Sequence, residues 1–578
     1  MPRFPRFLRR INTLRHQHGA PSRGARGLIG EHFAPLGGIA SGLVGGGPSA
    51  GDMMLLWFVV LYLLVSIGIG LFAATRVHNA KDFAVAGRHL PLPVVTATVF
   101  ATWFGAEAVF GVSATFAREG LRGVVADPFG SSLCLIIAGF FFATKLYKLN
   151  ILTLGDYFRL RYNRTVEVLT TVCIVASYLG WVSAQIKALG LVFNVVTHDA
   201  VSQTVGMILG AAIVLTYTTF GGMLSVAVLD FVQMGVIMGG MLYIGSVVAG
   251  MTGGVESVVD QARAAGKLEF FPTGGAAEWL TFLGAWMTMM LGSIPQQDVF
   301  QRITSAKSAR IAIFGSILGG SLYFCFTFVP MFIAYSATLI DPAVFNGLLE
   351  TDSQLILPNL VLSHMPLVAQ VIFFGAVLSA IMSCSSATLL APSVAFSENI
   401  VRGFFPRMGD RAFLRVMRLT IVGFAITVLG FALYSNASIF KMVENAYKVT
   451  LAGAFVPLFF GAYWKRATTQ GALAAIIGGL SSWLLVEVLL AGGGEAAAEG
   501  TEALSQYSYS LISTASLVPP QLIGLGVSAL GMIAGSLLPQ WVGHRHSQEP
   551  EHAQLHHHAA SATHHVPAGG QHHHPEQH

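Results

Sequence analysis

Hydroxyl and thiol side chains gather inside one long apolar stretch of the chain, in the segment AIMSCSSATLL at residues 380–390. No Asp, Glu, Lys or Arg occurs from residue 353 to residue 397, so little water is expected there. A buried hydroxyl without a hydrogen-bond partner costs about 1–3 kcal/mol. Partners from the protein or from a ligand are therefore needed for four residues, Ser383, Cys384, Ser385 and Ser386.

In a helix, residues 380, 383, 384 and 387 form one stripe of small side chains. That stripe carries the Ser383 hydroxyl and the Cys384 thiol, whereas the two following serines point elsewhere. Two interpretations stay open. Each serine can bond to the carbonyl four residues earlier, as is common in membrane helices. Alternatively, the stripe holds a small hard cation, and a second, interrupted helix supplies free carbonyl oxygens.

An interrupted apolar segment that could supply such carbonyls is VTATVFATWFGAEAVFGVS at residues 95–113, where Gly105 and Gly111 break the pattern. Glu107 lies between the two glycines. An acid inside a membrane span is costly, so Glu107 is by default a functional residue. The structural alternative is a buried ion pair with Lys187 in SAQIKALG.

The composition indicates the solvent in which these segments fold. Charged residues make up 11% of the chain, against about 25% in an average soluble domain, and the mean hydropathy is +0.65. A transmembrane helix needs about 20 apolar residues, and continuous runs of that kind recur, which argues against a β-barrel. We expect an all-α polytopic membrane protein of about 13 transmembrane helices, near residues 53–75, 92–117, 127–147, 165–195, 203–219, 225–250, 278–297, 309–338, 366–397, 416–435, 438–463, 470–491 and 517–541.

The Lys and Arg residues of the connections predict the orientation, because cytoplasmic loops are enriched in them. The side reached after the first span holds nineteen of them and the other side four. The first side is then cytoplasmic, which places the N-terminus outside and the C-terminus in the cytoplasm of a multi-pass protein of the cell (inner) membrane. The net charge of +5 reflects this topology, so no nucleic-acid partner is expected.

The two ends differ from the membrane domain expected at residues 53–541. Residues 1–52 form a basic, Gly-rich extension with seven Arg; a start codon assigned too early is favoured over a targeting signal. Residues 542–578 hold twelve of the nineteen His. A disordered cytoplasmic tail is favoured over a metal site, because no Cys or spaced partner defines a coordination geometry.

Four stretches in sequence order carry a family resemblance. They are TLGDYFRLRYNR (153–164), TYTTFGGMLSVAVLDFVQMGV (216–236), SIPQQDVFQRITSAKSAR (293–310), and the opening segment with its continuation SENIVRGFF (397–405). Together they resemble the sodium:solute symporter family over residues 53–541, nearest to its choline-transporter and proline-symporter side. The resemblance implies a LeuT-like fold, with five-helix units in inverted repeat, and transport by alternating access rather than enzymatic activity.

The resemblance also implies sodium as the coupling ion, without an organic cofactor. Sodium lies between the second and ninth spans in this family. Asp230 matches an acid associated with sodium leaving toward the cytoplasm. Cys384 departs from the pattern, because relatives usually have a second hydroxyl at this position. Carried over, the sodium ligands are backbone oxygens of Ala101, Phe104 and Ala380, the Ser383 hydroxyl, and the Cys384 position.

For the solute, Trp103 and Trp181 resemble two Trp of the choline transporter, where they could form part of a cation-binding cage. Ser131 and Gln296 stand where further aromatic residues are expected, and packing is the alternative role for the two Trp. The predicted substrate-binding residues are Trp103, Glu107, Trp181, Gln185 and Gln296. We expect a secondary active transporter in the lipid bilayer that symports a small-molecule substrate, an amino acid or other nitrogenous solute, with sodium. The alternatives are a membrane sensor with a separate signalling partner and a proton-coupled symporter.

Overall fold

The computed structural model describes residues 50–498 and 518–542, and within these ranges it contains helices and connections but no β-strand. One isolated bridge joins Leu90 to Ala306. Residues 1–49 and 543–578 lie outside the described residues. The predictions for the N-terminal extension and for the His-rich tail therefore stay predictions.

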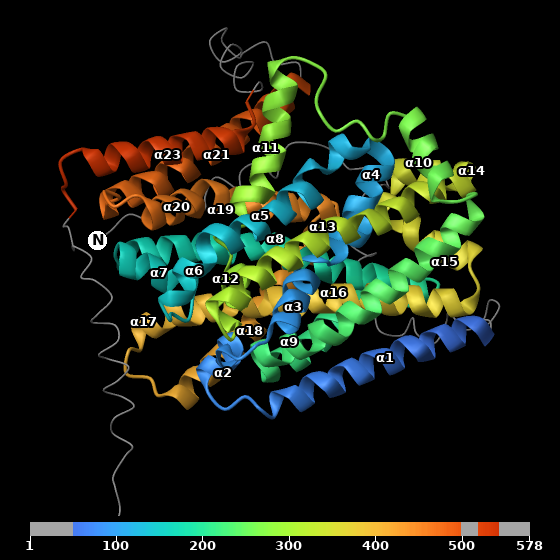
Figure 1. The fold of residues 1–578 in the computed structure, drawn as a ribbon, viewed down its shortest axis with the longest axis horizontal. Helices are drawn as coiled ribbons and strands as arrows, with labels where there is room; N and C mark the ends of the chain where they lie inside the picture. Colours follow the sequence, from blue (N-terminus) through green and yellow to red (C-terminus); the bar gives the residue numbers. More distant parts are fainter. Residues whose placement is uncertain (1–49, 499–517, 543–578) are drawn as a thin grey trace, which may run out of the picture. The chain divides into compact units, whose positions relative to one another are not determined.

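The helices follow one another along the chain as Figure 1 shows. The first half contains α1 (Ala50–Ala74), α2 (Ala80–Val85), α3 (Leu92–Trp103), α4 (Ser113–Glu119), α5 (Ser131–Ile137), α6 (Ala143–Lys148), α7 (Leu154–Arg161), α8 (Arg164–Val196), α9 (Gln203–Met251), α10 (Val255–Ala264) and α11 (Ala276–Gly292). The second half contains α12 (Gln297–Ser305), α13 (Ala309–Ile340), α14 (Pro342–Thr351), α15 (Ile356–His364), α16 (Leu367–Phe396), α17 (Arg402–Phe404), α18 (Asp410–Tyr434), α19 (Ile439–Thr450), α20 (Val456–Tyr463), α21 (Thr469–Ala498) and α23 (Pro520–Leu537).

Ten helices of the described residues are long and apolar enough to cross a membrane, and one bent pair raises the number to eleven. The sequence predicted thirteen. The difference has two sources: the spans expected at 203–219 and 225–250 form the single helix α9, and the span expected at 278–297 contains α11, which has 17 residues. An all-helical polytopic membrane protein is confirmed, but the count of thirteen is not.

Helix α9 is too long for a single crossing. Its 49 residues would extend about 74 Å at the α-helical rise, against a hydrocarbon core of about 30 Å. Gly222 interrupts it with φ 52° and ψ −150°, a left-handed conformation that favours glycine. A Cβ atom at Gly222 would lie 2.5 Å from the Phe83 carbonyl oxygen. The break falls where the sequence predicted a connection.

One break in an apolar helix and one connection between two helices form the framework of the site. Helix α3 ends at Trp103, and after a short non-helical stretch the chain continues as the π-helical turn η4 (Glu107–Val112) and α4, bent by 54°. Helix α11 ends at Gly292, and α12 begins at Gln297. Interrupted membrane helices expose backbone groups that intact helices use internally, so these breaks can bind ligands.

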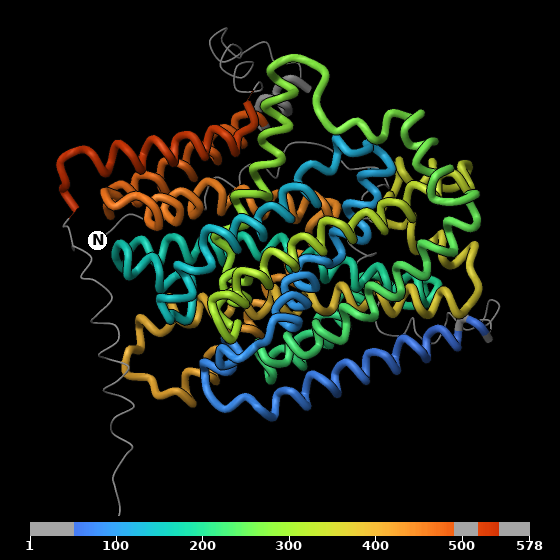
Figure 2. Tube along the Cα trace, viewed as in Figure 1, coloured from blue at the N-terminus to red at the C-terminus, as the bar shows by residue number. Residues whose placement is uncertain are grey.

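Helix α16 carries the hydroxyl and thiol cluster through the interior of the bundle. It packs against α3, α8 and α9, and its residues from Ala376 to Ala395 are all buried. Figure 2 shows α1, in blue, along one margin of the bundle, and the paired α21 and α23, in orange and red, along another. The stripe that contains Ser383 and Cys384 therefore faces other helices, which can supply partners for its buried polar groups.

Candidate functional site

Glu107 lies at the break after α3, with its carboxylate fully enclosed by protein. Its Oε1 accepts a hydrogen bond from Trp181 Nε1 at 3.0 Å, and its Oε2 accepts one from Gln185 Nε2. Gln185 Oε1 accepts a bond from the Ala106 amide at 2.9 Å. The Gln185 amide therefore connects the acid to the backbone of the break.

Gly105 is required at this break by close approach. A Cβ atom there would lie 2.7 Å from Gln185 Oε1, 2.7 Å from Glu107 Oε2 and 2.8 Å from the Cys384 Cβ. Only a residue without a side chain lets α8 and α16 approach the interrupted helix so closely. Gly105, which the sequence predicted as a break, is thus also the point where the interrupted helix contacts α8 and α16.

Three aromatic rings pack together, and one of them, Trp181, donates its indole N–H to the Glu107 carboxylate. The ring centroids of Trp103 and Trp181 are 5.4 Å apart, those of Trp181 and Tyr447 5.5 Å, and those of Trp103 and Tyr447 6.1 Å with planes 10° from parallel. Tyr178 stacks on Trp181 at 5.8 Å. Aromatic faces attract cations electrostatically, so the rings and the carboxylate favour the same sign of ligand charge.

A second buried carboxylate, that of Asp298, closes the aromatic cluster at the start of α12. Its Oδ2 accepts a bond from Trp103 Nε1 at 3.2 Å, and its Oδ1 accepts one from the Tyr178 hydroxyl. Both interrupted helices thus contribute one acid each to the same aromatic cluster. The donors to these carboxylates are neutral groups.

A separate group of oxygens lies where α3, α9 and α16 meet. Ser383 Oγ is 3.0 Å from the Ala101 carbonyl oxygen and 2.6 Å from Asp230 Oδ1, and the Thr98 hydroxyl donates to Asp230 Oδ2. A hydroxyl has one proton, so Ser383 can donate to only one of its two neighbours at a time. Such converging oxygens form the donor set that a hard cation prefers.

The other predicted cation ligands lie around these oxygens. The last bond of the α3 pattern runs from Phe104 N to Phe100 O, so the carbonyls of Ala101 and Phe104 lie at the end of the helix. Ala380 is buried one turn before Ser383 on α16. The Cys384 thiol points elsewhere, since its Sγ lies 3.9 Å from Glu107 Oε1. Of the predicted ligands, the structure brings Ala101 and Ser383 into direct contact, and Ser383 also contacts Asp230, the acid predicted for the sodium exit route.

Back-bonding accounts for the other hydroxyls of the α16 cluster. Ser385 Oγ donates to the Ile381 carbonyl at 2.6 Å, and Ser386 Oγ donates to the Ser383 carbonyl at 3.0 Å. Ser383 instead reaches across to two other helices. The back-bonding interpretation is therefore confirmed for Ser385 and Ser386, and the cation-binding interpretation of Ser383 stays a prediction.

The alternative of a Glu107–Lys187 ion pair is wrong. Lys187 Nζ donates to the carbonyls of Ser435 and Ala437, at 3.4 and 2.8 Å. A long basic side chain can reach carbonyls at the end of a neighbouring helix, and α18 ends at Tyr434, just before these two residues. Glu107 is left with its neutral donors.

Gln296 and Ser131 stand apart from the aromatic cluster. Gln296 Nε2 donates to Ser177 Oγ at 2.9 Å and to Thr450 Oγ1 at 3.3 Å, and so links α8 to α19. Ser131 donates to Asp127 Oδ1 at 2.6 Å, as does the Tyr323 hydroxyl. The hydrogen bonds of Gln296 thus link α8 to α19 and involve none of the cluster's aromatic side chains.

Tyr178, Tyr447 and Asp298 belong to the cluster but were not among the residues predicted from the sequence. Asp298 had a usable signal, since it is an acid next to the predicted span at 278–297 and acids inside membrane domains are expensive. Tyr178 lies three residues before Trp181 on α8, on the same face. Tyr447 had no signal, because its contact with the two Trp depends on how α19 packs against α8.

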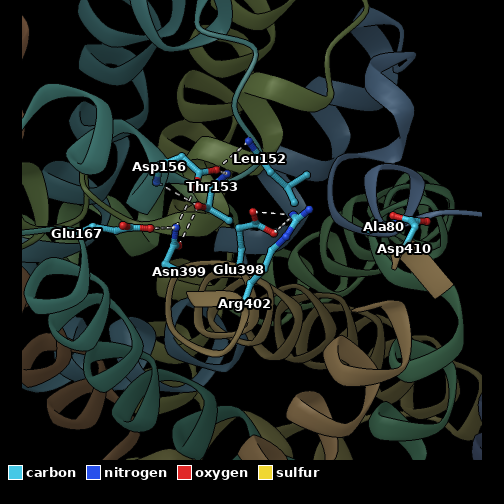
Figure 3. A network of polar contacts seen from close by, with 9 residues as sticks. All are labelled: Ala80, Leu152, Thr153, Asp156, Glu167, Glu398, Asn399, Arg402 and Asp410. Atoms are coloured by element: carbon cyan, nitrogen blue, oxygen red, sulfur yellow. Dashed lines mark hydrogen bonds and ion pairs between the residues drawn. The ribbon is translucent and has the colours of Figure 1, made fainter. Parts of the chain in front are cut away.

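A second polar network lies at the arginine-rich side, where α7, α8 and the turn η9 (Ser397–Val401) meet (Figure 3). Asn399 Nδ2 donates to Asp156 Oδ1 and to Glu167 Oε1, both at 3.0 Å, and Asn399 Oδ1 accepts from the Thr153 hydroxyl at 2.8 Å. Burial and the negative charges of Glu398 and Glu167 raise the pKa of Asp156 to about 7. The network ties the end of α16 to the start of α8.

Comparison with known proteins gives matches over most of this chain. Residues 83–479 match the model of the sodium:solute symporter family. The chain is 28% identical over 446 residues to high affinity choline transporter 1 of Homo sapiens, covering 74% of this chain and 75% of that protein. It is 24% identical over 452 residues to the osmoregulated proline transporter OpuE of Bacillus subtilis (strain 168), covering 74% and 87%.

Among solved structures, a sodium-coupled sialic acid symporter in a substrate-bound outward-open state is similar, with a TM-score of 0.68 and 18% sequence identity. The similarity covers 86% of this chain and 99% of that one. At this identity the likeness concerns the fold alone. Among the described residues, no group of three or more His, Cys, Asp or Glu side chains is placed to hold a metal ion.

Proposed function

We propose that this chain, which belongs to the sodium:solute symporter family, carries a small positively charged ammonium solute across the membrane together with sodium. The observation that carries the proposal is the Glu107 carboxylate, which is buried, hydrogen-bonded only by neutral donors, and flanked by the rings of Trp103, Trp181 and Tyr447. The proposal narrows the nitrogenous solute expected from the sequence to a cation.

Charge balance favours a cationic solute over other classes. A buried carboxylate without a counter-charge is strongly unfavourable, and a solute ammonium beside Glu107 would neutralise it. Each aromatic face adds about 0.5–2 kcal/mol of cation–π attraction. A carboxylate-bearing anion would face Glu107 with repulsion, and a neutral sugar would leave the Glu107 charge uncompensated.

The relatives agree with this solute class. High affinity choline transporter 1 is named for a quaternary ammonium solute, and the proline transporter OpuE for a zwitterionic amine. A choline-like ammonium without a carboxylate fits the two acids of the aromatic cluster best. We therefore place a quaternary or fully substituted ammonium group against the faces of Trp103 and Trp181, with Gln185 as the polar neighbour.

We place the coupling sodium at the junction of α3, α9 and α16. Its ligands are the carbonyl oxygens of Ala101, Phe104 and Ala380 and the Ser383 hydroxyl, with Asp230 supplying the negative charge. Cys384 is not a ligand in this arrangement, because its thiol faces Glu107. Sodium coordination by the end of α3 would fix the break that carries Glu107. That shared break gives a physical route for coupling, since each ligand orders the segment that the other needs.

The orientation expected from the sequence defines which face of the carrier is cytoplasmic, and the sodium gradient then sets the direction of transport. The arginine-rich connections lie on the cytoplasmic side of the cell (inner) membrane. The solute site opens alternately to the two sides of this membrane. Asp230 contacts Ser383 at the sodium junction, and we assign it the role of the acid that sodium passes as it leaves toward the cytoplasm. Uptake driven by the sodium gradient is the expected mode.

The test is uptake of labelled solutes by purified protein in proteoliposomes. The panel contains choline, glycine betaine and proline, with glucose and acetate as neutral and anionic controls, and sodium and proton gradients are imposed separately. We expect sodium-driven uptake of choline, weaker uptake of the zwitterions, and none of the controls. Uptake driven by protons and indifferent to sodium would overturn the sodium assignment, and preference for glucose or acetate would overturn the solute class.

A further inference from the structure

A cavity of about 470 Å³ lies between α4, α10, α13 and the second half of α9. Of the residues shown to line it, only Ser246 and Tyr335 carry a side-chain oxygen, and the Ser246 hydroxyl donates to the Tyr243 carbonyl at 2.7 Å. Small-molecule sites have volumes of about 300–1,000 Å³, so the cavity has the size of a binding site. An apolar cavity does not hold water, so an apolar group is the ligand that fits it.

The cavity lies at the depth of lipid acyl chains and reaches the outer surface of the bundle. Two of its lining residues, Leu242 of α9 and Val255 of α10, are 53% and 56% exposed. The α13 residues that line it fall between 328 and 335, which is 5 to 12 residues before that helix ends at Ile340. At the helical rise this is about 8–18 Å, and half of the hydrocarbon core is about 15 Å thick. The cavity therefore opens to the leaflet beside α10, which is the outer one in the orientation expected from the sequence.

Helix α10 forms one wall of the cavity with its apolar face. Gly253 and Gly254 have φ values of 80° and 105°, which glycine adopts without strain, and they turn the chain so that α10 packs against α13 (Figure 1). Val258 is buried, whereas Asp260 and Arg263 are exposed and pair with each other at 2.7 Å. Amphipathic helices of this kind lie in the membrane interface with their apolar face toward the acyl chains. The wall that α10 supplies is therefore at the level where a lipid headgroup meets its chains.

Every Lys and Arg of the connections expected on this side of the membrane lies one or two positions along the chain from a residue that lines the cavity. They are Arg118, Arg122, Arg263 and Lys267. The three Arg each pair with an acid, at 2.5, 2.7 and 2.7 Å. Lys267 makes no ion pair within the described ranges, and its Nζ donates to the Arg118 carbonyl oxygen at 2.6 Å. An ammonium has three donors, so Lys267 can also bind an anion beside the cavity.

We propose that the cavity binds an acyl chain of a phospholipid from the adjacent leaflet, and that Lys267 binds the phosphate of that lipid. The Leu121 amide donates to the Lys267 carbonyl oxygen at 2.8 Å, and both Leu121 and Leu268 line the cavity. Lys267 is thereby fixed at the edge of the cavity. A cation beside an apolar cavity matches the order of groups in a phospholipid, in which a phosphate precedes the acyl chains. Such binding is independent of the solute and the ion that the protein transports.

A bound acyl chain would contact two helices at once. Phe116 of α4 and Tyr335 of α13 both line the cavity, and their ring centroids are 6.1 Å apart. Helix α4 belongs to the bent pair that carries Glu107, so a lipid between α4 and α13 would stabilise this arrangement of the bend. A ligand that binds only the folded state raises the stability of that state. We therefore expect Tm in detergent to rise when the phospholipid is added.

The test measures lipid binding directly, with purified protein in dodecyl maltoside. One probe is phosphatidylethanolamine with a diazirine in one acyl chain, and the other is diacylglycerol with the same chain and no phosphate. After illumination, the labelled peptides are identified by mass spectrometry. We expect saturable labelling within residues 242–262 and 328–335, which unlabelled phosphatidylethanolamine displaces.

Gly245→Leu fills the cavity from α9. Gly245 lines the cavity, and among the described residues a Cβ atom there would meet only Val329 Cγ1, at the ordinary contact distance of 3.5 Å. The added side chain displaces about two methylene groups of a bound acyl chain, so the Kd of both probes should rise about tenfold. Gly239→Leu is the matched control, because a Cβ atom at this position of α9 would meet nothing within 4 Å in the described part of the chain. It should change neither the Kd values nor the rise in Tm.

Lys267→Gln tests the headgroup contact. It should raise the Kd of the phosphatidylethanolamine probe about fivefold, the usual contribution of one basic residue to binding an anionic headgroup group. The Kd of the diacylglycerol probe should stay unchanged, because that lipid has no phosphate. Lys81→Gln removes the same charge from an exposed position on α2 and should change neither Kd.

Two results would overturn the inference. Labelling that spreads over the exposed helices and is insensitive to Gly245→Leu means ordinary lipid contact around the bundle. A loss of labelling in Gly245→Leu, with Lys267→Gln affecting both probes equally or neither, means an apolar ligand without a phosphate. If Gly245→Leu does not fold, Val259→Trp fills the cavity from α10, and unchanged labelling in that variant rejects the cavity as the site.

Discussion

The Ser383 hydroxyl of α16 lies 2.6 Å from Asp230 Oδ1 on α9 and 3.0 Å from the Ala101 carbonyl at the end of α3. Three helices thus converge on one side chain that can donate a single proton. The same helix carries Ser385, whose hydroxyl bonds to its own backbone at Ile381. Two serines two residues apart therefore provide a matched pair for testing the sodium junction.

Replacing Ser383 by Ala should weaken sodium binding. One hydrogen bond or ligand contact to a charged group is worth about 1.5–3 kcal/mol, so the half-saturating sodium concentration should rise about tenfold to a hundredfold. Uptake at saturating sodium and solute should change little. Ser385→Ala removes a hydroxyl of the same size from the same helix and should leave the sodium dependence unchanged. Equal effects of the two substitutions would contradict the placement of sodium at Ser383.

Glu107→Gln should mainly weaken the apparent affinity for the solute. Gln keeps the size of the side chain but removes the charge that balances the ammonium, so the KM for choline should rise about tenfold to a hundredfold, as expected for loss of a charge-assisted contact. Adding Lys187→Met should give no recovery, because Lys187 bonds to the carbonyls of Ser435 and Ala437. Recovery in the double variant would show that the two side chains pair in the functioning protein.

Tyr447 allows the ring and the hydroxyl to be tested separately. Its hydroxyl has no hydrogen-bond partner among the described residues, whereas its ring lies 5.5 Å from Trp181 and 6.1 Å from Trp103. Tyr447→Phe keeps the ring and should leave the KM for choline within about twofold. Tyr447→Leu removes a cation–π face worth about 1–2 kcal/mol and should raise the KM about fivefold to thirtyfold. A packing role alone would make both variants alike once expression is matched.

The local parts of the site could be predicted from sequence, and its long-range contacts could not. The break at Gly105, the acid at Glu107 and the stripe containing Ser383 all arise from residues close together in the chain. The contact of Tyr447 with Trp103 joins residues more than three hundred positions apart and depends on how α19 packs. The break in α9 also has a local signal, because Gly222 lies in the connection expected between the spans at 203–219 and 225–250.

Asp156 should make the stability of the protein fall as the pH rises toward 7. Its pKa is raised from 3.8 to about 7 in the folded state by burial and by the charges of Glu398 and Glu167. Between these two values the folded protein keeps a proton that the unfolded chain releases, so the free energy of unfolding decreases with increasing pH and levels off above about 7. Asp156→Asn cannot release that proton and should lack this part of the decrease. The measurement is Tm in detergent from pH 5 to pH 8 for both proteins.

Asp410→Asn is the control variant. It removes an exposed acid that accepts a bond from the Ala80 amide on the same side, and it should retain the wild-type decrease in Tm. A decrease of wild-type size in Asp156→Asn would show that Asp156 is ionised in the folded protein over this range, and that Asn399 then donates to a charged carboxylate.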